Sequence, residues 1–163
     1  MKTQTKITIV LAALVALSVV RTASAQTATQ TVTFQVTAIN QVAVTGAPSL
    51  VINAAVAGSA PTSVTAAGNT WSVTTNQTGA MITASIPSAM PAGLTLSANL
   101  VAPAGATSTG LTAIGTVAVN VVTGITKLNA AALALTYQLD ATAAAGVVAS
   151  ATRVVTYTIT GGV

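Results

Sequence analysis

The sequence has no cysteine, no histidine and no glutamate, and Asp140 is its single acidic residue. Disulfide bonds are therefore excluded, and so are the cysteine, histidine and multiple-carboxylate ligand sets from which zinc and calcium sites are built. Nucleophilic catalysis needs a base beside the nucleophile, and acid–base catalysis needs two titratable groups near the working pH. We therefore expect no enzyme activity, no catalytic residue, no cofactor and no bound metal.

Charge is also scarce, because charged residues make up only 4% of the chain. Three of the five cations lie within the first 25 residues, so the later chain keeps only Lys127 and Arg153 against Asp140. Nucleic-acid binding requires clustered lysine and arginine, so the high pI predicts no nucleic-acid partner. Proteins with a net charge near zero tend to associate, and the composition therefore favours self-association.

Residues 1–25 have the pattern of a secretory signal peptide. Lysines come first, a mostly apolar run follows from Ile7 to Val20, and small residues precede Gln26. We predict cleavage between Ala25 and Gln26, and a secreted, extracellular or cell-surface location. An uncleaved anchor is the alternative, but the apolar run is shorter than the roughly 20 residues of a spanning helix, so we expect no stable membrane span after cleavage.

Residues 31–45 alternate with period two, which predicts a half-buried β-strand. At about 3.3 Å per residue this strand would span roughly 45 to 50 Å, against roughly 17 to 20 Å for an ordinary strand. It therefore either bends within its own domain, at polar Asn40, or reaches a neighbouring molecule. We expect residues 26–45 to form this N-terminal strand and residues 46–163 to form the domain. The apolar face, our candidate assembly strand, comprises Val32, Phe34, Val36, Ala38, Val42 and Val44.

About seven further short runs alternate in the same way and are separated by glycine, proline and asparagine turns. Without a convincing amphipathic helix, they predict an all-β, immunoglobulin-like antiparallel β-sandwich of about seven to eight strands. Because about seven strands complete such a sandwich, the N-terminal strand is surplus to its own domain. The four-residue link 76–79 predicts a hairpin. The main runs are residues 50–56, 70–75, 80–86, 94–102, 111–122, 133–139 and 153–159.

Several single residues carry their own expectations. The aromatic residues lie on apolar strand faces and are predicted to pack in the core: Phe34, Trp71, Tyr137 and Tyr157. Asp140 follows a strand and is predicted to cap a turn. Asn76, Gln77 and Thr78 match the N-glycosylation acceptor pattern, which is short enough to arise by chance. Lys127, Asp140 and several asparagines supply the parts of a Lys–Asn cross-link, although we favour a solvated lysine in a loop.

Residues 32–37 and 155–160 share one order of residue types: branched, threonine, aromatic, polar, branched, threonine. One interpretation is that both are ordinary strands of a threonine-rich chain. The other is that both fill similar grooves, one from within the domain and one from a neighbour.

Two resemblances concern function. Trp71, Ser72 and Val73, together with residues 135–139, resemble the paired motifs of WxL cell-surface domains, with Val73 in place of a leucine and Tyr137 in place of the second tryptophan. This resemblance implies a monomeric module that binds the cell wall.

The signal peptide, the alternating N-terminal strand, the run at residues 90–96 and the end of the chain resemble secreted immunoglobulin-like proteins of bacterial surfaces. They are similar to fimbrial subunits, in which an N-terminal strand completes the sheet of a neighbour. This resemblance implies a structural subunit of an extracellular filament, pilus or surface layer, a homopolymer built by head-to-tail contacts.

Overall fold

The computed structural model describes residues 24–163. The predicted signal peptide, residues 1–25, lies outside the described residues except for its last two positions. The chain divides into two units after Gln35, and the second unit is Val36–Val163. Within residues 24–163, no helix is long and apolar enough to cross a membrane.

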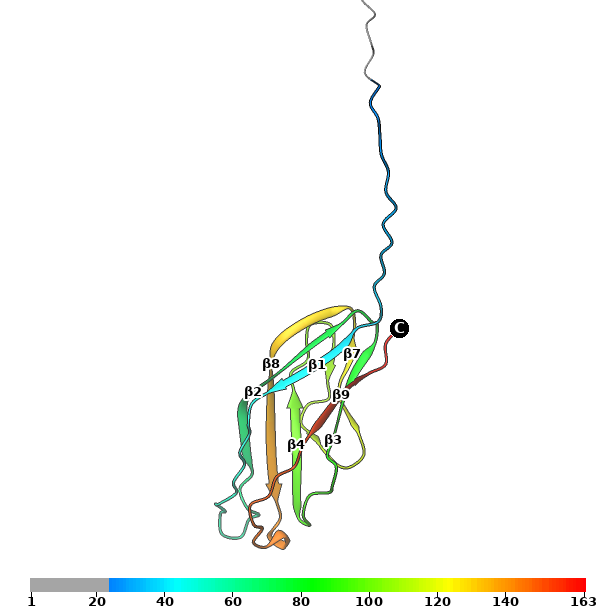
Figure 1. Ribbon diagram of the computed structural model, residues 1–163. Coiled ribbons are helices and arrows are strands. Elements are labelled where there is room, and N and C mark those ends of the chain that lie inside the picture. Colours follow the sequence, from blue (N-terminus) through cyan, green and yellow to red (C-terminus); the bar gives the residue numbers. More distant parts are fainter. Residues whose placement is uncertain (1–23) are drawn as a thin grey trace, which may run out of the picture. The chain divides into compact units, whose positions relative to one another are not determined.

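The second unit is a sandwich of two antiparallel sheets (Figure 1), as the alternating runs predict. One sheet has the order β1-β2-β8-β4-β6, with β1 (Asn40–Thr45), β2 (Val64–Thr75), β8 (Leu128–Ala141), β4 (Leu94–Leu100) and β6 (Thr112–Ala113). The other has the order β5-β7-β3-β9, with β5 (Thr107–Ser108), β7 (Val119–Ile125), β3 (Ala80–Ser85) and β9 (Thr156–Thr160). A single 3₁₀ turn, η1 (Ala143–Ala145), follows β8. The described residues thus contain nine strands rather than seven to eight, because β5 and β6 have only two residues each.

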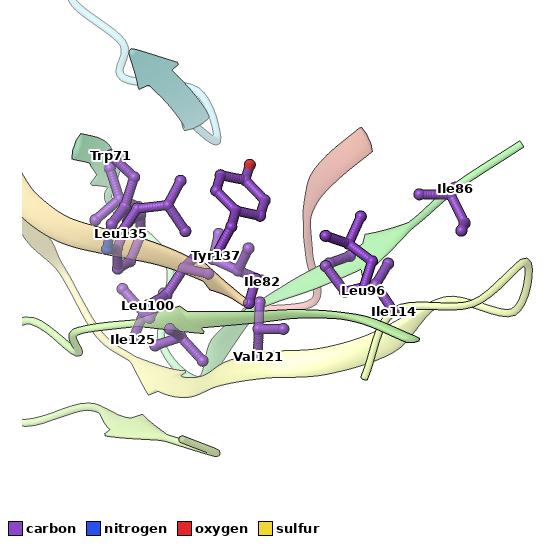
Figure 2. Packing of buried hydrophobic residues seen from close by; sticks show 14 of the residues in the cluster. Trp71, Ile82, Ile86, Leu96, Leu100, Ile114, Val121, Ile125, Leu135 and Tyr137 are labelled. Atoms are coloured by element: carbon purple, nitrogen blue, oxygen red, sulfur yellow. The ribbon is translucent and has the colours of Figure 1, made fainter. Parts of the chain in front are cut away.

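The core lies between the two sheets and is built from the inward positions of each strand (Figure 2). Trp71 of β2 is fully buried, and its indole Nε1 donates a hydrogen bond of 3.1 Å to the carbonyl of Val101. Burying an aliphatic or aromatic side chain of this size contributes about 1.5 to 3 kcal/mol. The largest fully buried side chains are Trp71, Val73, Ile82, Leu100, Val121, Val122, Ile125 and Leu135.

The predicted hairpin across residues 76–79 is wrong. β2 pairs with β1 and β8, whereas β3 pairs with β7 and β9, so this link carries the chain from one sheet to the other. Both strands bury one face, with Trp71 and Val73 on β2 and Ile82 and Ala84 on β3. These faces pack against each other across the core, which strands lying side by side in one sheet cannot do.

Two other predicted runs are interrupted. Residues 50–56 form no strand and contain only an isolated bridge between Ala55 and Pro61. The run 111–122 divides into β6 and β7 because the backbone between them bridges the sheets. The amide of Ile114 donates to Leu96 of one sheet, and the carbonyl of Gly115 accepts from Ile86, which follows β3 of the other.

Gly46 follows β1 directly, and its backbone conformation and surroundings leave no room for a side chain. Its φ is +124°, and a Cβ built there would lie 2.1 Å from Oδ1 of Asn69. Asn69 cannot easily withdraw, since it is buried at the irregularity in β2 and donates to the carbonyl of Ala66 at 3.2 Å. Gly58 also has a positive φ, +86°, but nothing lies within 4 Å of its Cβ position.

We therefore expect Gly46→Ala to lower the free energy of unfolding by roughly 2 to 4 kcal/mol, from backbone strain and overpacking together. Gly58→Ala introduces backbone strain without overpacking and should lower the free energy of unfolding by about 1 kcal/mol. Urea denaturation of the two variants measures the difference. Equal losses would show that the contact with Asn69 is not what requires glycine at position 46.

Candidate functional site

The predicted assembly strand, residues 31–45, is paired over less than half its length. Residues 24–39 form no strand, and pairing with β2 begins at Asn40 and ends at Thr45. The observed strand is therefore shorter than predicted, and residues 40–45 belong to the sandwich rather than to a separate N-terminal strand. Within β1, Val42 packs against the core and Val44 is about half exposed.

The apolar side chains before β1 are open to solvent. Val32 is 71% exposed, Phe34 89% and Val36 78%, and Ala38 is also exposed. The prediction that Phe34 packs in the core is wrong, because the alternation shows which face is apolar but not what covers it. An uncovered row of apolar side chains that includes an aromatic ring is typical of an interaction site. Ala25 and Gln26, the predicted cleavage position, are likewise exposed and outside any element.

Asn76 forms hydrogen bonds with Thr37 and Ile39, which directly precede β1. Its Oδ1 accepts from the amide of Ile39 at 2.8 Å, and its Nδ2 donates to the carbonyl of Thr37 at 2.7 Å. Its own amide donates to the carbonyl of Ile39 at 3.2 Å. The predicted glycosylation acceptor thus uses its amide group to hold residues 37–39 beside the end of β2. The sequence pattern gave no signal of this role.

One long side of the sandwich is closed by contacts between the two sheets, and the other is open. On the β5 and β6 side, Thr109 connects the sheets, because its amide donates to Val121 at 3.1 Å and its hydroxyl lies 2.9 Å from that of Thr112. On the opposite side, β1 and β9 are the last strands of their sheets within residues 24–163. They present unpaired backbone groups, which are a template for a further strand.

A pair of tyrosines holds edge strand β9 against the other sheet. The hydroxyl of Tyr157 donates to that of Tyr137 on β8 at 3.0 Å. Burial raises the pKa of Tyr137 above its ordinary value, and burial followed by the bond to Tyr137 raises the pKa of Tyr157 further. Both rings therefore lie on inward faces, as predicted, and both hydroxyls stay protonated at any ordinary pH.

An open groove of about 610 Å³ lies at the end of the sandwich where the chain leaves β8. Its lining includes Leu139 and Ala141 from the end of β8, which has 14 residues, whereas the strands of the smaller sheet have at most 7. Leu94 and Leu139 line the groove and are only half-buried, although their neighbours Leu96 and Tyr137 are buried. Residues 50–55 and 148–151 supply the walls.

The remaining charged residues do not form a reactive site. Lys127 immediately precedes β8 and Asp140 is the residue before its end, so they lie roughly 40 Å apart along the strand. Asp140 therefore cannot assist a Lys–Asn cross-link. It does not cap a turn as predicted, since it lies within β8, where it accepts from Nε2 of Gln138 at 2.9 Å and from the hydroxyl of Ser63.

Comparison of the chain with protein-family models, with curated proteins and with solved structures gave no match. Its function is therefore inferred from the N-terminal segment, the open edges and the groove.

The tyrosine pair predicts a loss of stability in alkali. Unfolded tyrosines ionise near pH 10, whereas the folded pair stays protonated, so the unfolded state is favoured increasingly as the pH rises above about 10. Each tyrosine contributes up to about 1.4 kcal/mol per pH unit in this range. Tyr157→Phe should roughly halve the slope of unfolding free energy against pH, measured by urea denaturation from pH 8 to 11.5. An unchanged slope would contradict the assignment.

The Asn76 contact predicts protection of one backbone amide. In Asn76→Ala the amide of Ile39 loses its acceptor, and its hydrogen exchange should accelerate about fivefold, the equivalent of about 1 kcal/mol for one hydrogen bond. Asn76→Asp keeps an acceptor at the same place and serves as the matched control. Protection that survives in the alanine variant would show that the backbone bond from Asn76 to Ile39 suffices.

Proposed function

We propose that this chain is the structural subunit of an extracellular filament, pilus or surface layer, in which residues 31–39 add as a β-strand to the sheet of the next subunit. The observation that carries the proposal is a strand-patterned apolar segment that is exposed and forms no strand, in a chain whose sandwich buries its own core without that segment. Addition of a strand to a sheet edge derives affinity from backbone hydrogen bonds and selectivity from alternate side chains.

The energies involved are sufficient for such a contact. Covering Val32, Phe34 and Val36 would contribute about 5 to 9 kcal/mol in total. Association itself loses roughly 4 to 15 kcal/mol of translational and rotational freedom. The two quantities are of the same order, so the backbone hydrogen bonds, at about 0.5 to 1.5 kcal/mol each, decide how stable the contact is.

The geometry favours donation over folding back. Asn76 holds Thr37 and Ile39 beside the end of β2, so a return onto the subunit's own sheet would have to begin before Thr37. A donated strand and its acceptor are different surfaces of one subunit. A contact between different surfaces is heterologous and does not close on itself, which generates a filament.

The alternative is a monomeric cell-surface or cell-wall-binding module of the WxL-like kind. The residues that carry that resemblance, Trp71 and Tyr137, are buried in the core. They would support the fold of such a module rather than contact a wall polymer, so the geometry favours assembly.

We expect the chain 26–163 to sediment as a polymer and the chain 40–163 to sediment as a folded monomer. The truncation keeps residues 40–45 because β1 belongs to the sandwich. Near-UV circular dichroism of both chains, through Trp71, reports whether the core is intact.

A triple serine variant of Val32, Phe34 and Val36 tests the same contact without deletion, and serines at Thr31, Thr33 and Gln35 provide the matched control on the opposite face. Polymers of the truncated chain would refute strand donation. A monomeric full chain that binds isolated cell walls would establish the alternative.

A further inference from the structure

Two segments beside the groove have the sequence of strands but are largely unpaired, except that residues 54–56 bond to the turn that follows them. Residues 50–56 alternate, and from Arg153 onward half-buried and exposed positions alternate into β9. Among the described residues, none forms a backbone hydrogen bond with positions 47–53 or 147–154. Extended backbone with unpaired N–H and C=O groups is satisfied by water or by an incoming strand.

The groove between these segments has a mixed apolar and polar lining and is almost neutral. Leu50, Ile52, Leu94, Leu139 and Val148 line it. Arg153 is the one charged residue in the lining, and its guanidinium is occupied, because it donates to the carbonyls of Ala89 at 3.2 Å and Thr152 at 2.9 Å. A ligand of this groove is therefore recognised by apolar side chains and backbone groups.

Residues 31–39 have the complementary properties. They carry no charge, they place Val32, Phe34 and Val36 on one face, and they are long enough to run along the whole wall of residues 50–55. Their residue order from 32 to 37 is repeated at 155–160, where Tyr157 and Ile159 pack inward against the core along the same open side. The sandwich thus already accepts this pattern once, in the strand that follows the wall 148–151.

We propose that the groove walled by residues 50–55 and 148–151 is the acceptor site, and that its occupant is residues 31–39 of a second copy of this chain. The inference rests on the proposed function, in which that segment is donated. The walls run in opposite directions, one leaving β1 and the other entering β9 (Figure 1). An inserted strand is therefore antiparallel to one wall and parallel to the other, and it pairs with both.

The outer edges of β1 and β9 are the competing acceptors. Either edge offers a row of backbone groups on one side only. A second groove, of about 550 Å³, lies where the chain enters β1, but polar side chains and Lys127 make up most of its lining. The larger groove offers unpaired backbone groups from two segments, together with the apolar side chains of Leu94 and Leu139 in its lining. It therefore satisfies both the backbone and the side chains of the incoming segment.

The absence of cysteine permits a direct test by disulfide trapping. Val36→Cys is mixed in turn with four single variants of the chain 26–163 and oxidised mildly. Ala54→Cys and Ala149→Cys report the two walls, whereas Ala43→Cys and Thr158→Cys report the outer edges of β1 and β9. We expect mixed dimers with the wall variants at least about tenfold more abundant than with the edge variants.

A charge placed on a wall gives an independent test. Ala54→Glu and Ala149→Glu alter exposed side chains, so the subunits should fold, but a buried unpaired carboxylate should reduce the polymer fraction about tenfold or more. Thr116→Glu, exposed and away from the lining, is the control.

If Val36→Cys cross-links mainly to the edge variants and the wall variants with glutamate still polymerise, the groove is not the acceptor. Strand donation itself would not be contradicted by that result. A chain 26–163 that stays monomeric overturns the proposed function itself.

Discussion

Trp71 is buried on the inner face of β2, and its indole binds the carbonyl of Val101 directly after β4. This contact joins two strands of the larger sheet over the centre of the core and sets the face of β2 that meets β3. The link 76–79 must then cross between the sheets, because the apolar faces on either side of it have to oppose each other.

The open side lacks the usual protection against strand addition. Natural edge strands are blocked by charged residues, proline or bulges that prevent pairing with other chains. Residues 31–45 and β9 contain no charged residue and no proline. A long, uncharged, strand-patterned segment with exposed valine and phenylalanine side chains would be an aggregation hazard in a protein that stays monomeric. The same properties are required of a segment that pairs with a second copy.

Alternation predicts the faces of strands well, because Trp71, Ile82 and Leu135 are buried wherever their strands form. It predicts partners poorly, because a four-residue link suits a hairpin and a crossing between sheets equally. Residues 50–56 alternate as clearly as β3 does but form no strand, since strand formation depends on a neighbouring backbone that local sequence does not encode. The prediction that Phe34 packs in the core failed for the same reason, because no other part of the described chain covers its side chain. The groove was not predictable either, because its walls come from segments far apart in the sequence.

The scarcity of charge bears on specificity as well as on solubility. Charged pairs usually set register and partner choice at interfaces, but the chain after residue 25 has only Lys127, Arg153 and Asp140. Register in a paired strand has another source, since a shift by one residue moves every side chain to the opposite face. In the assembly proposed above, such a shift would turn Phe34, the largest side chain of the segment, towards water, and it would bury Thr33 and Gln35 without partners. Alternation alone would therefore align one proposed subunit on the next, although the chain has almost no charges to do so.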